Sequence, residues 1–206
     1  MSTALNVPNQ ITLTRLGLAI LFFALLAQYS QRAPQPLLLD VTNALFIIAA
    51  ITDILDGYLA RKWGMETSLG RVLDPFVDKV LVCGAFILFV GPGFVDADGR
   101  NVTGVSTWMV VLIVGRELLV TGLRGFSEAQ GLAFGASVWG KMKMWMQSIA
   151  APVIMLLVAH ERDWGAAGWS DDVKMVVVWM TVLATLFSCG HYLFQSRHIL
   201  EAGEPI

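Results

Sequence analysis

Four aspartates stand close together in the sequence, although the residues around them are mostly apolar. Asp53 and Asp56 are three positions apart, and Asp74 and Asp78 are four apart. One such charge at the centre of a membrane-spanning helix costs roughly 2.5 to 3.5 kcal/mol. Four together cost on the order of 10 kcal/mol, which is comparable to the stability of a whole domain. We therefore expect these carboxylates to have a chemical role, because a purely structural role would not compensate for this cost.

Helical geometry places the four aspartates on two faces that can meet. At about 100° per residue, the face of the first pair carries Asp53, Asp56, Gly57, Ala60 and Arg61. The face of the second pair carries Gly70, Asp74 and Asp78. A short turn around Gly64 makes the two helices antiparallel neighbours. The two acidic faces are thus expected to converge on one cavity at the cytoplasmic end.

Converging carboxylates repel one another unless they are protonated or bound to cations. Oxygen ligands without His or Cys favour a hard divalent ion, Mg²⁺ or Mn²⁺, with room for two ions. The small residues on both faces let a substrate approach the backbone, or else they serve close helix packing. Arg61 is either a counter-ion for the aspartates or a ligand for a phosphate group.

The elements that hold these residues are predicted to be membrane helices. Apolar residues make up 56% of the 206 residues and charged residues 15%, whereas soluble domains have about 25% charged residues. Six apolar stretches are long enough to cross a bilayer, and they lie at about 11–29, 38–60, 74–92, 105–123, 136–159 and 173–195. We expect an all-α membrane protein with six transmembrane helices, in which residues 1–206 form a single domain.

The charge distribution predicts the orientation and excludes one class of partner. The formal net charge of −2 leaves no polycationic surface for nucleic acid. With both termini on one side of the membrane, that side collects most of the 14 lysines and arginines. Positive residues favour the cytoplasmic side. Both termini and the aspartates are therefore expected to face the cytoplasm, from a position in the cell (inner) membrane.

The spacing of the acidic motif resembles the signature of the CDP-alcohol phosphotransferase family. The pattern Asp53-x2-Asp56-Gly57-x2-Ala60-Arg61-x8-Gly70-x3-Asp74-x3-Asp78 matches that signature at every fixed position. Residues 6–12, 115–124 and 140–143 are similar to further landmarks of a branch whose acceptor is a phosphorylated glycerol. Met144 departs from this branch, which often has Thr there. The resemblance covers the first five predicted helices.

The resemblance implies a phosphatidyl transfer from CDP-diacylglycerol to sn-glycerol 3-phosphate, with release of CMP. It implies six transmembrane helices in a homodimer embedded in the lipid bilayer. It also implies that Asp53, Asp56 and Asp74 bind one divalent ion. Asp53, Asp74 and Asp78 would bind the second, and Asp78 would be the catalytic base. Such ions neutralise a pyrophosphate while a carboxylate takes the proton of the attacking hydroxyl.

The resemblance also assigns a binding site for the CDP-diacylglycerol donor. Its residues would be Asn9, Gln10, Ile11, Thr12, Gly57, Arg61, Thr67 and Gly70. Asn9 and Thr12 have a second interpretation as helix caps, because they stand where the first helix begins.

Three further bases are candidates for the acceptor site. Arg116 and Arg124 are eight residues apart and so share a helical face, and Lys141 lies near the start of the next segment. Three cations suit a doubly charged phosphate monoester better than a neutral alcohol, although they could also serve only the topology. Lys143 points about 200° away from Lys141, so we expect it to reach the membrane interface. Glu117 is expected to pair with one of the arginines.

Three alternatives stay open. An ion-coupled transporter would also carry intramembrane carboxylates, but near the bilayer midplane and within inverted repeats, which are not evident here. An intramembrane aspartyl protease needs only two aspartates that share a proton. A sibling enzyme of the same family would use another acceptor, as in the synthesis of cardiolipin or of phosphatidylinositol phosphate.

Overall fold

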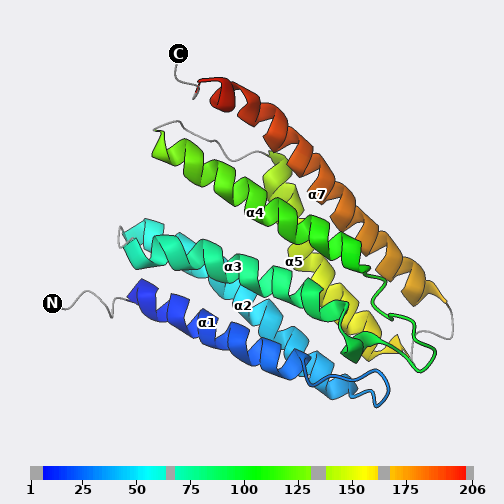
Figure 1. Ribbon diagram of the computed structural model, residues 1–206. Coiled ribbons are helices and arrows are strands. Elements are labelled where there is room, and N and C mark those ends of the chain that lie inside the picture. Colours follow the sequence, from blue (N-terminus) through cyan, green and yellow to red (C-terminus); the bar gives the residue numbers. More distant parts are fainter. Residues whose placement is uncertain (1–6, 64–67, 131–137, 162–167, 203–206) are drawn as a thin grey trace.

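The fold is a bundle of long α-helices (Figure 1). The computed structural model describes residues 7–63, 68–130, 138–161 and 168–202, and the side chains among them except at 7–12, 54–63, 68–75, 141, 196 and 198–202. This part contains α1 (Val7–Leu26), α2 (Pro36–Trp63), α3 (Ser68–Phe89), α4 (Thr107–Ala129), α5 (Val138–Ala159) and α7 (Trp169–Ala202). A short 3-10 helix, η1 (Pro92–Phe94), follows α3, and the described residues contain no β-strand.

The helices agree with the predicted apolar stretches, and the prediction of an all-helical protein is confirmed. The largest difference is in α7, which runs from Trp169 to Ala202, beyond the apolar stretch 173–195. Its polar ends continue the helix, since hydropathy marks only the apolar part of a helix and not its termini.

Three of the described helices are long and apolar enough to cross a membrane. The qualifying segments are Pro36–Asp53, Val138–Ala159 and Trp169–Gln195, and α1 contributes the shorter apolar segment Leu13–Leu26. Charged residues lie inside α3 and α4, among them Asp78 and Arg116. The structure thus supports a helical membrane protein with three candidate spans.

Aromatic side chains form much of the core. The Phe22 ring of α1 lies 5.4 Å from the Phe46 ring of α2, measured between centroids. The Phe86 and Phe89 rings of α3 lie 5.8 Å apart and are completely buried. Around this core, α1 packs on α2 and α3, α5 packs on α2 and α7, and α4 packs on α3 and α7. Each helix therefore has a defined inner face.

The outer faces of the helices remain apolar. Leu37 is 75% exposed, Leu118 is 69% exposed and Phe187 is 62% exposed, and they belong to three different helices. Water-soluble monomers rarely expose apolar surface to this extent. This outer surface is therefore suited to contact with lipid chains.

A polar cluster closes one end of the bundle, which we call the loop end because it holds the connections 27–35 and 90–106. The buried Lys174 donates to the Val102 carbonyl at 2.8 Å and contacts Glu161 Oε1 at 3.1 Å and Asp171 Oδ1 at 2.7 Å. The Gln31 amide donates to the other oxygen of Glu161 at 3.2 Å. The two connections, the end of α5 and α7 are thereby joined.

Candidate active site

Two of the four aspartates line one cavity that lies about midway along α2 and α3, farther from the loop end. We call the part of the bundle from this cavity to the end opposite the loop end the aspartate end. Asp53 from α2 and Asp78 from α3 both border a cavity of about 210 Å³. The remaining lining comes from α2 and α5 and is largely apolar, with Phe46, Ile47, Ala50, Ile51, Met144, Trp145, Ser148, Ile149 and Pro152. The structure therefore brings together two carboxylates that are 25 positions apart in the chain, next to an apolar surface.

The other predicted residues of the donor and metal sites lie outside the described side chains. They are Asn9, Gln10, Ile11, Thr12, Asp56, Gly57, Arg61, Thr67, Gly70, Asp74 and the acceptor candidate Lys141. For Asp53 and Asp78 the arrangement can be described in detail.

Arg15 of α1 neutralises Asp53. Its guanidinium forms an ion pair with the Asp53 carboxylate, and its side chain is buried. From the sequence, Arg15 was expected only to be one of the bases that set the orientation. Its position inside an apolar helix was nevertheless a signal, because a charge at such a position usually has a functional partner.

Asp78 differs from Asp53 in its surroundings. In the part of the chain that the structure describes, no hydrogen bond or ion pair joins the Asp78 carboxylate to another residue. Asp78 also borders a second, very small cavity of about 10 Å³, together with Cys83, Glu117, Lys143 and Gln147. Its carboxylate is thus available to a ligand and has a buried lysine nearby.

The prediction that Lys143 reaches the membrane interface is wrong. Lys143 is only 5% exposed, and its ammonium forms an ion pair with Glu117 of α4 instead of reaching the interface. The physical reason is the Glu117 carboxylate, which is itself buried and needs cations around it. Glu117 also accepts from Arg116 Nη1 at 3.0 Å, so it pairs with an arginine as expected.

Arg116 and Arg124 both turn toward α7. Arg116 Nη2 donates to the Ser188 hydroxyl at 2.6 Å, and Arg124 Nη2 donates to the Tyr192 hydroxyl at 2.6 Å. Neither Ser188 nor Tyr192 was predicted from the sequence, because a hydroxyl within an apolar helix has no distinctive sequence pattern. The two arginines therefore belong to one cluster between α4 and α7.

The residues at the aspartate end fit a hard divalent cation. Within the described residues, no group of three His, Cys, Asp or Glu side chains gathers around one point. The donors that do line the cavity are carboxylates, which suit Mg²⁺ and Mn²⁺. Asp53 is paired with the Arg15 guanidinium, whereas Asp78 has no such partner among the described residues, so its oxygens are available to a cation.

A helical bundle with an apolar exterior, and with carboxylates on a partly apolar cavity, is the arrangement expected of a membrane protein that handles a molecule with both charged and apolar parts. Comparison with known proteins makes the class specific: the model of the CDP-alcohol phosphatidyltransferase family matches residues 5–187. The chain belongs to this family, and the resemblance inferred from the acidic motif is confirmed.

Three bacterial relatives carry the name CDP-diacylglycerol–glycerol-3-phosphate 3-phosphatidyltransferase. The protein from Bacillus subtilis strain 168 is 37% identical over 203 residues, which cover 95% of this chain and 97% of the relative. The Rickettsia bellii protein is 30% identical and covers 93% and 94%, respectively. The Haemophilus influenzae protein is also 30% identical and covers 91% of each chain. The likeness therefore extends over nearly the whole chain.

Proposed function

We propose that this protein is a phosphatidyltransferase that converts CDP-diacylglycerol and sn-glycerol 3-phosphate into phosphatidylglycerophosphate and CMP. The observation that carries the proposal is the cavity shared by Asp53 and Asp78. The printed names of the relatives, at 30 to 37% identity over most of their length, support the same reaction.

The cavity accounts for a donor with both a charged and an apolar part. Asp53 and Asp78 form its polar wall, while Phe46, Trp145 and Ile149 form part of its apolar wall. A diacylglycerol moiety can lie against the apolar residues of α2 and α5 while the pyrophosphate faces the carboxylates. The CDP moiety would contact Asn9, Gln10, Ile11, Thr12, Gly57, Arg61, Thr67 and Gly70.

Two divalent ions, Mg²⁺ or Mn²⁺, are proposed at the aspartates. Asp53, Asp56 and Asp74 would hold one, and Asp53, Asp74 and Asp78 the other. When bound, the ions supply positive charge that neutralises the pyrophosphate and polarises the phosphorus–oxygen bond to be broken. The buried Arg15 pairs with the Asp53 carboxylate and holds it in place.

Asp78 is the proposed base. An ionised carboxylate near the acceptor can take the hydroxyl proton as the glycerol oxygen bonds to the phosphorus. The bond between that phosphorus and the CMP oxygen then breaks, and CMP leaves. Because Asp78 has no partner among the described residues that would hold its oxygens elsewhere, it can serve this purpose more readily than Asp53.

Arg116, Arg124 and Lys141 are the proposed ligands of the glycerol 3-phosphate. Guanidinium groups match the geometry of phosphate oxygens and remain charged. Lys143 adds a further cation next to the Asp78 cavity. The cations would hold the phosphate end of the acceptor, and so leave its hydroxyl end to face the carboxylates.

The proposal includes a complete arrangement in the membrane. All six helices would span the bilayer as a single domain of residues 1–206, with both termini and the active site on the cytoplasmic side of the inner membrane. Two copies would form a homodimer. Cysteine labelling of the loop end from either side of sealed vesicles tests the orientation, because the loop end should react only from outside the cytoplasm.

The first experiment follows CMP release by purified protein in detergent. CDP-diacylglycerol is supplied with Mg²⁺ or Mn²⁺, and glycerol 3-phosphate, inositol phosphate, serine and phosphatidylglycerol are offered separately. Release that needs both glycerol 3-phosphate and metal, and stops with a chelator, supports the proposal. Release that needs another acceptor would show that glycerol 3-phosphate is the wrong acceptor, while CDP-diacylglycerol would remain the donor. If folded protein releases no CMP with any of these acceptors, the proposed reaction is wrong and transport becomes the next hypothesis to test.

A further inference from the structure

One tyrosine of α7 contacts both arginines of α4. Tyr192 is completely buried. The guanidinium carbons of Arg116 and Arg124 each lie 5.4 Å from the centre of its ring. Cations at this distance over an aromatic face are attracted to it. A single ring therefore holds two like charges whose positions on the helix are eight residues apart.

Hydrogen bonds fix the orientation of both guanidinium groups. The Tyr192 hydroxyl accepts from Arg124, and the Ser188 hydroxyl, one helical turn earlier on α7, accepts from Arg116. The Nε atoms of both arginines are buried and have no hydrogen-bond partner in the described part of the chain. A buried N–H group without a partner is unfavourable, so these two donors are suited to a ligand.

The charges of the cluster do not balance. Arg116, Arg124 and Lys143 bring three positive charges, and among the described residues the carboxylate within bonding distance of this group is Glu117. A phosphate monoester carries close to two negative charges at neutral pH. Such a ligand would both compensate the excess charge and accept from the unpartnered donors.

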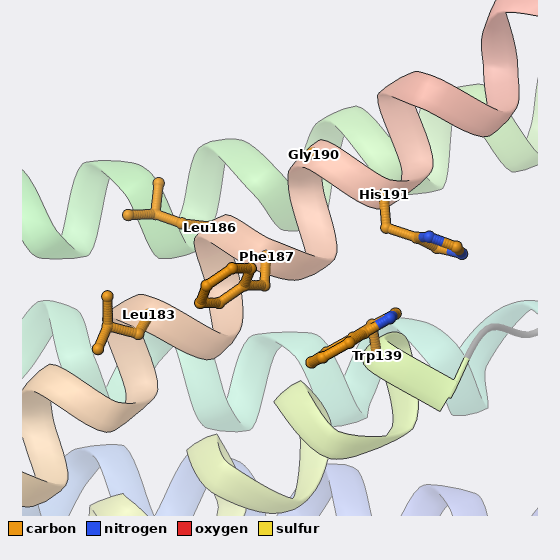
Figure 2. Close-up of a pocket in the computed structure, with 6 residues that line it drawn as sticks. All are labelled: Trp139, Leu183, Leu186, Phe187, Gly190 and His191. Carbon is orange, nitrogen blue, oxygen red and sulfur yellow. The ribbon is translucent and has the colours of Figure 1, made fainter.

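The start of α5 is shaped to admit Tyr192. A Cβ atom on Gly140 would lie 2.7 Å from the Tyr192 hydroxyl oxygen, which is closer than real Cβ atoms approach. The neighbouring Trp139 stacks on Phe187 of α7, with ring centroids 5.9 Å apart and planes inclined by 27°. Figure 2 shows Trp139 facing Phe187 and His191 across the groove between α5 and α7. This contact holds α5 and α7 together next to the tyrosine.

We propose that Tyr192, assisted by Ser188, is a positioning residue that directs Arg116 and Arg124 toward the phosphate of the acceptor. Both residues follow position 187, where the match to the family model ends. The inference rests on the proposed function, since it specifies how the acceptor site of that reaction is built. Tyr192 acts through the arginines and need not touch the substrate.

The test replaces Tyr192 by phenylalanine, which keeps the ring and removes the hydroxyl that Arg124 needs. In Tyr192→Phe we expect the KM for glycerol 3-phosphate and the Kd for inorganic phosphate to rise about tenfold. The kcat and the KM for CDP-diacylglycerol should stay within about twofold of wild type, because a positioning role affects the acceptor alone.

Tyr29→Phe is the matched control, because Tyr29 is also buried and its hydroxyl also bonds a polar side chain, Gln31, but at the loop end. It should leave both constants unchanged. A double variant adds a second criterion: once Arg124→Gln has removed the guanidinium, Tyr192→Phe should have no further effect on phosphate affinity.

The possible results distinguish the positioning role of Tyr192 from the proposed use of glycerol 3-phosphate as the acceptor. Unchanged affinity for both ligands in Tyr192→Phe overturns the inference, as does a wild type that binds neither ligand. An equal loss in Tyr29→Phe would show a general effect on folding and would also overturn it. If wild type binds phosphate in a Tyr192-dependent way but does not use glycerol 3-phosphate, the acceptor is wrong and the positioning role stands.

Discussion

Two of the lysines whose side chains the structure describes are buried and each contacts a glutamate, one at the loop end and one at the aspartate end. They differ in how many hydrogen-bond partners their ammonium groups have. Lys174 at the loop end has three oxygen partners at 2.7 to 3.1 Å, one for each of its N–H groups. Lys143 at the aspartate end has one ion-pair partner among the described residues, Glu117, and borders a cavity with Asp78.

The difference distinguishes a structural lysine from a functional one. A buried ammonium whose donors all meet protein oxygens has nothing left for a ligand, and its role is to join the segments that carry those oxygens. An ammonium with donors to spare beside a cavity is costly to bury, unless a ligand completes its bonding. Burial alone, which is 2% exposure for Lys174 and 5% for Lys143, does not separate the two.

The largest expected effect on activity comes from replacing Asp78, whose carboxylate borders the same small cavity as Lys143. Asp78→Asn should lower the turnover number by at least about 10³-fold, because an amide cannot take a proton from the acceptor hydroxyl. CMP release measures turnover, and a separate titration should show CDP-diacylglycerol still binding. Recovery of activity at high Mn²⁺ would mean that Asp78 is chiefly a metal ligand, and turnover close to wild type would exclude it as the base.

Removing the lysine of the aspartate end should affect catalysis more than stability. Lys143→Met retains the apolar stem and leaves Glu117 paired with Arg116, so the protein should fold. We expect kcat/KM for glycerol 3-phosphate to fall by about 10²-fold, since a charge-assisted contact to the phosphate is lost. Steady-state kinetics with a thermal melt in the same detergent provide the measurement. Full activity in a stable variant would place Lys143 outside the site.

The corresponding change at the loop end should have the opposite outcome. Lys174→Met leaves the Val102 carbonyl and Glu161 without their shared cation, and we expect a loss of about 2 kcal/mol in the free energy of unfolding. The kcat of the folded fraction should stay within about twofold of wild type. Denaturant titration followed by helical circular dichroism measures the stability. A Lys174→Met variant that is stable but inactive would contradict the structural role assigned to Lys174.

The smallest effect is expected from a change in the partly exposed pair His160 and Asp40 at the loop end. His160 Nε2 lies 3.2 Å from Asp40 Oδ1, and both side chains are more than a quarter exposed. His160→Gln should therefore change the stability by less than about 0.5 kcal/mol and leave the activity unchanged. The same melts and CMP assays measure it. A larger effect would mean that the loop end contributes to the site after all.

The sequence was sufficient to predict the helices and the family. Long apolar stretches determine where helices lie, and the spacing of the aspartates is itself a helical pattern, so both can be read from one chain. The signature also directed attention to Asp53 and Asp78, which the structure brings to one cavity. These features depend on residues that are near one another in the sequence.

Side-chain contacts between residues on different helices could not be predicted in the same way. The 200° between Lys141 and Lys143 indicated that the two side chains point in different directions, but the burial of Lys143 depends on Glu117, which is 26 positions away on another helix. Arg15 was visible as a charge in an apolar helix, while its pairing with Asp53 depends on how α1 packs on α2. Tyr192 and Ser188 acquire significance only from the packing of α4 against α7.

The bonds around Lys174 and Glu161 have a mechanical consequence. They fasten α7, the end of α5 and the connections through Gln31 and Val102 to one another. Segments fastened in this way resist sliding past one another along the axis of the bundle. The loop end therefore sets the register of α7 and of the end of α5 against the connections that cover them.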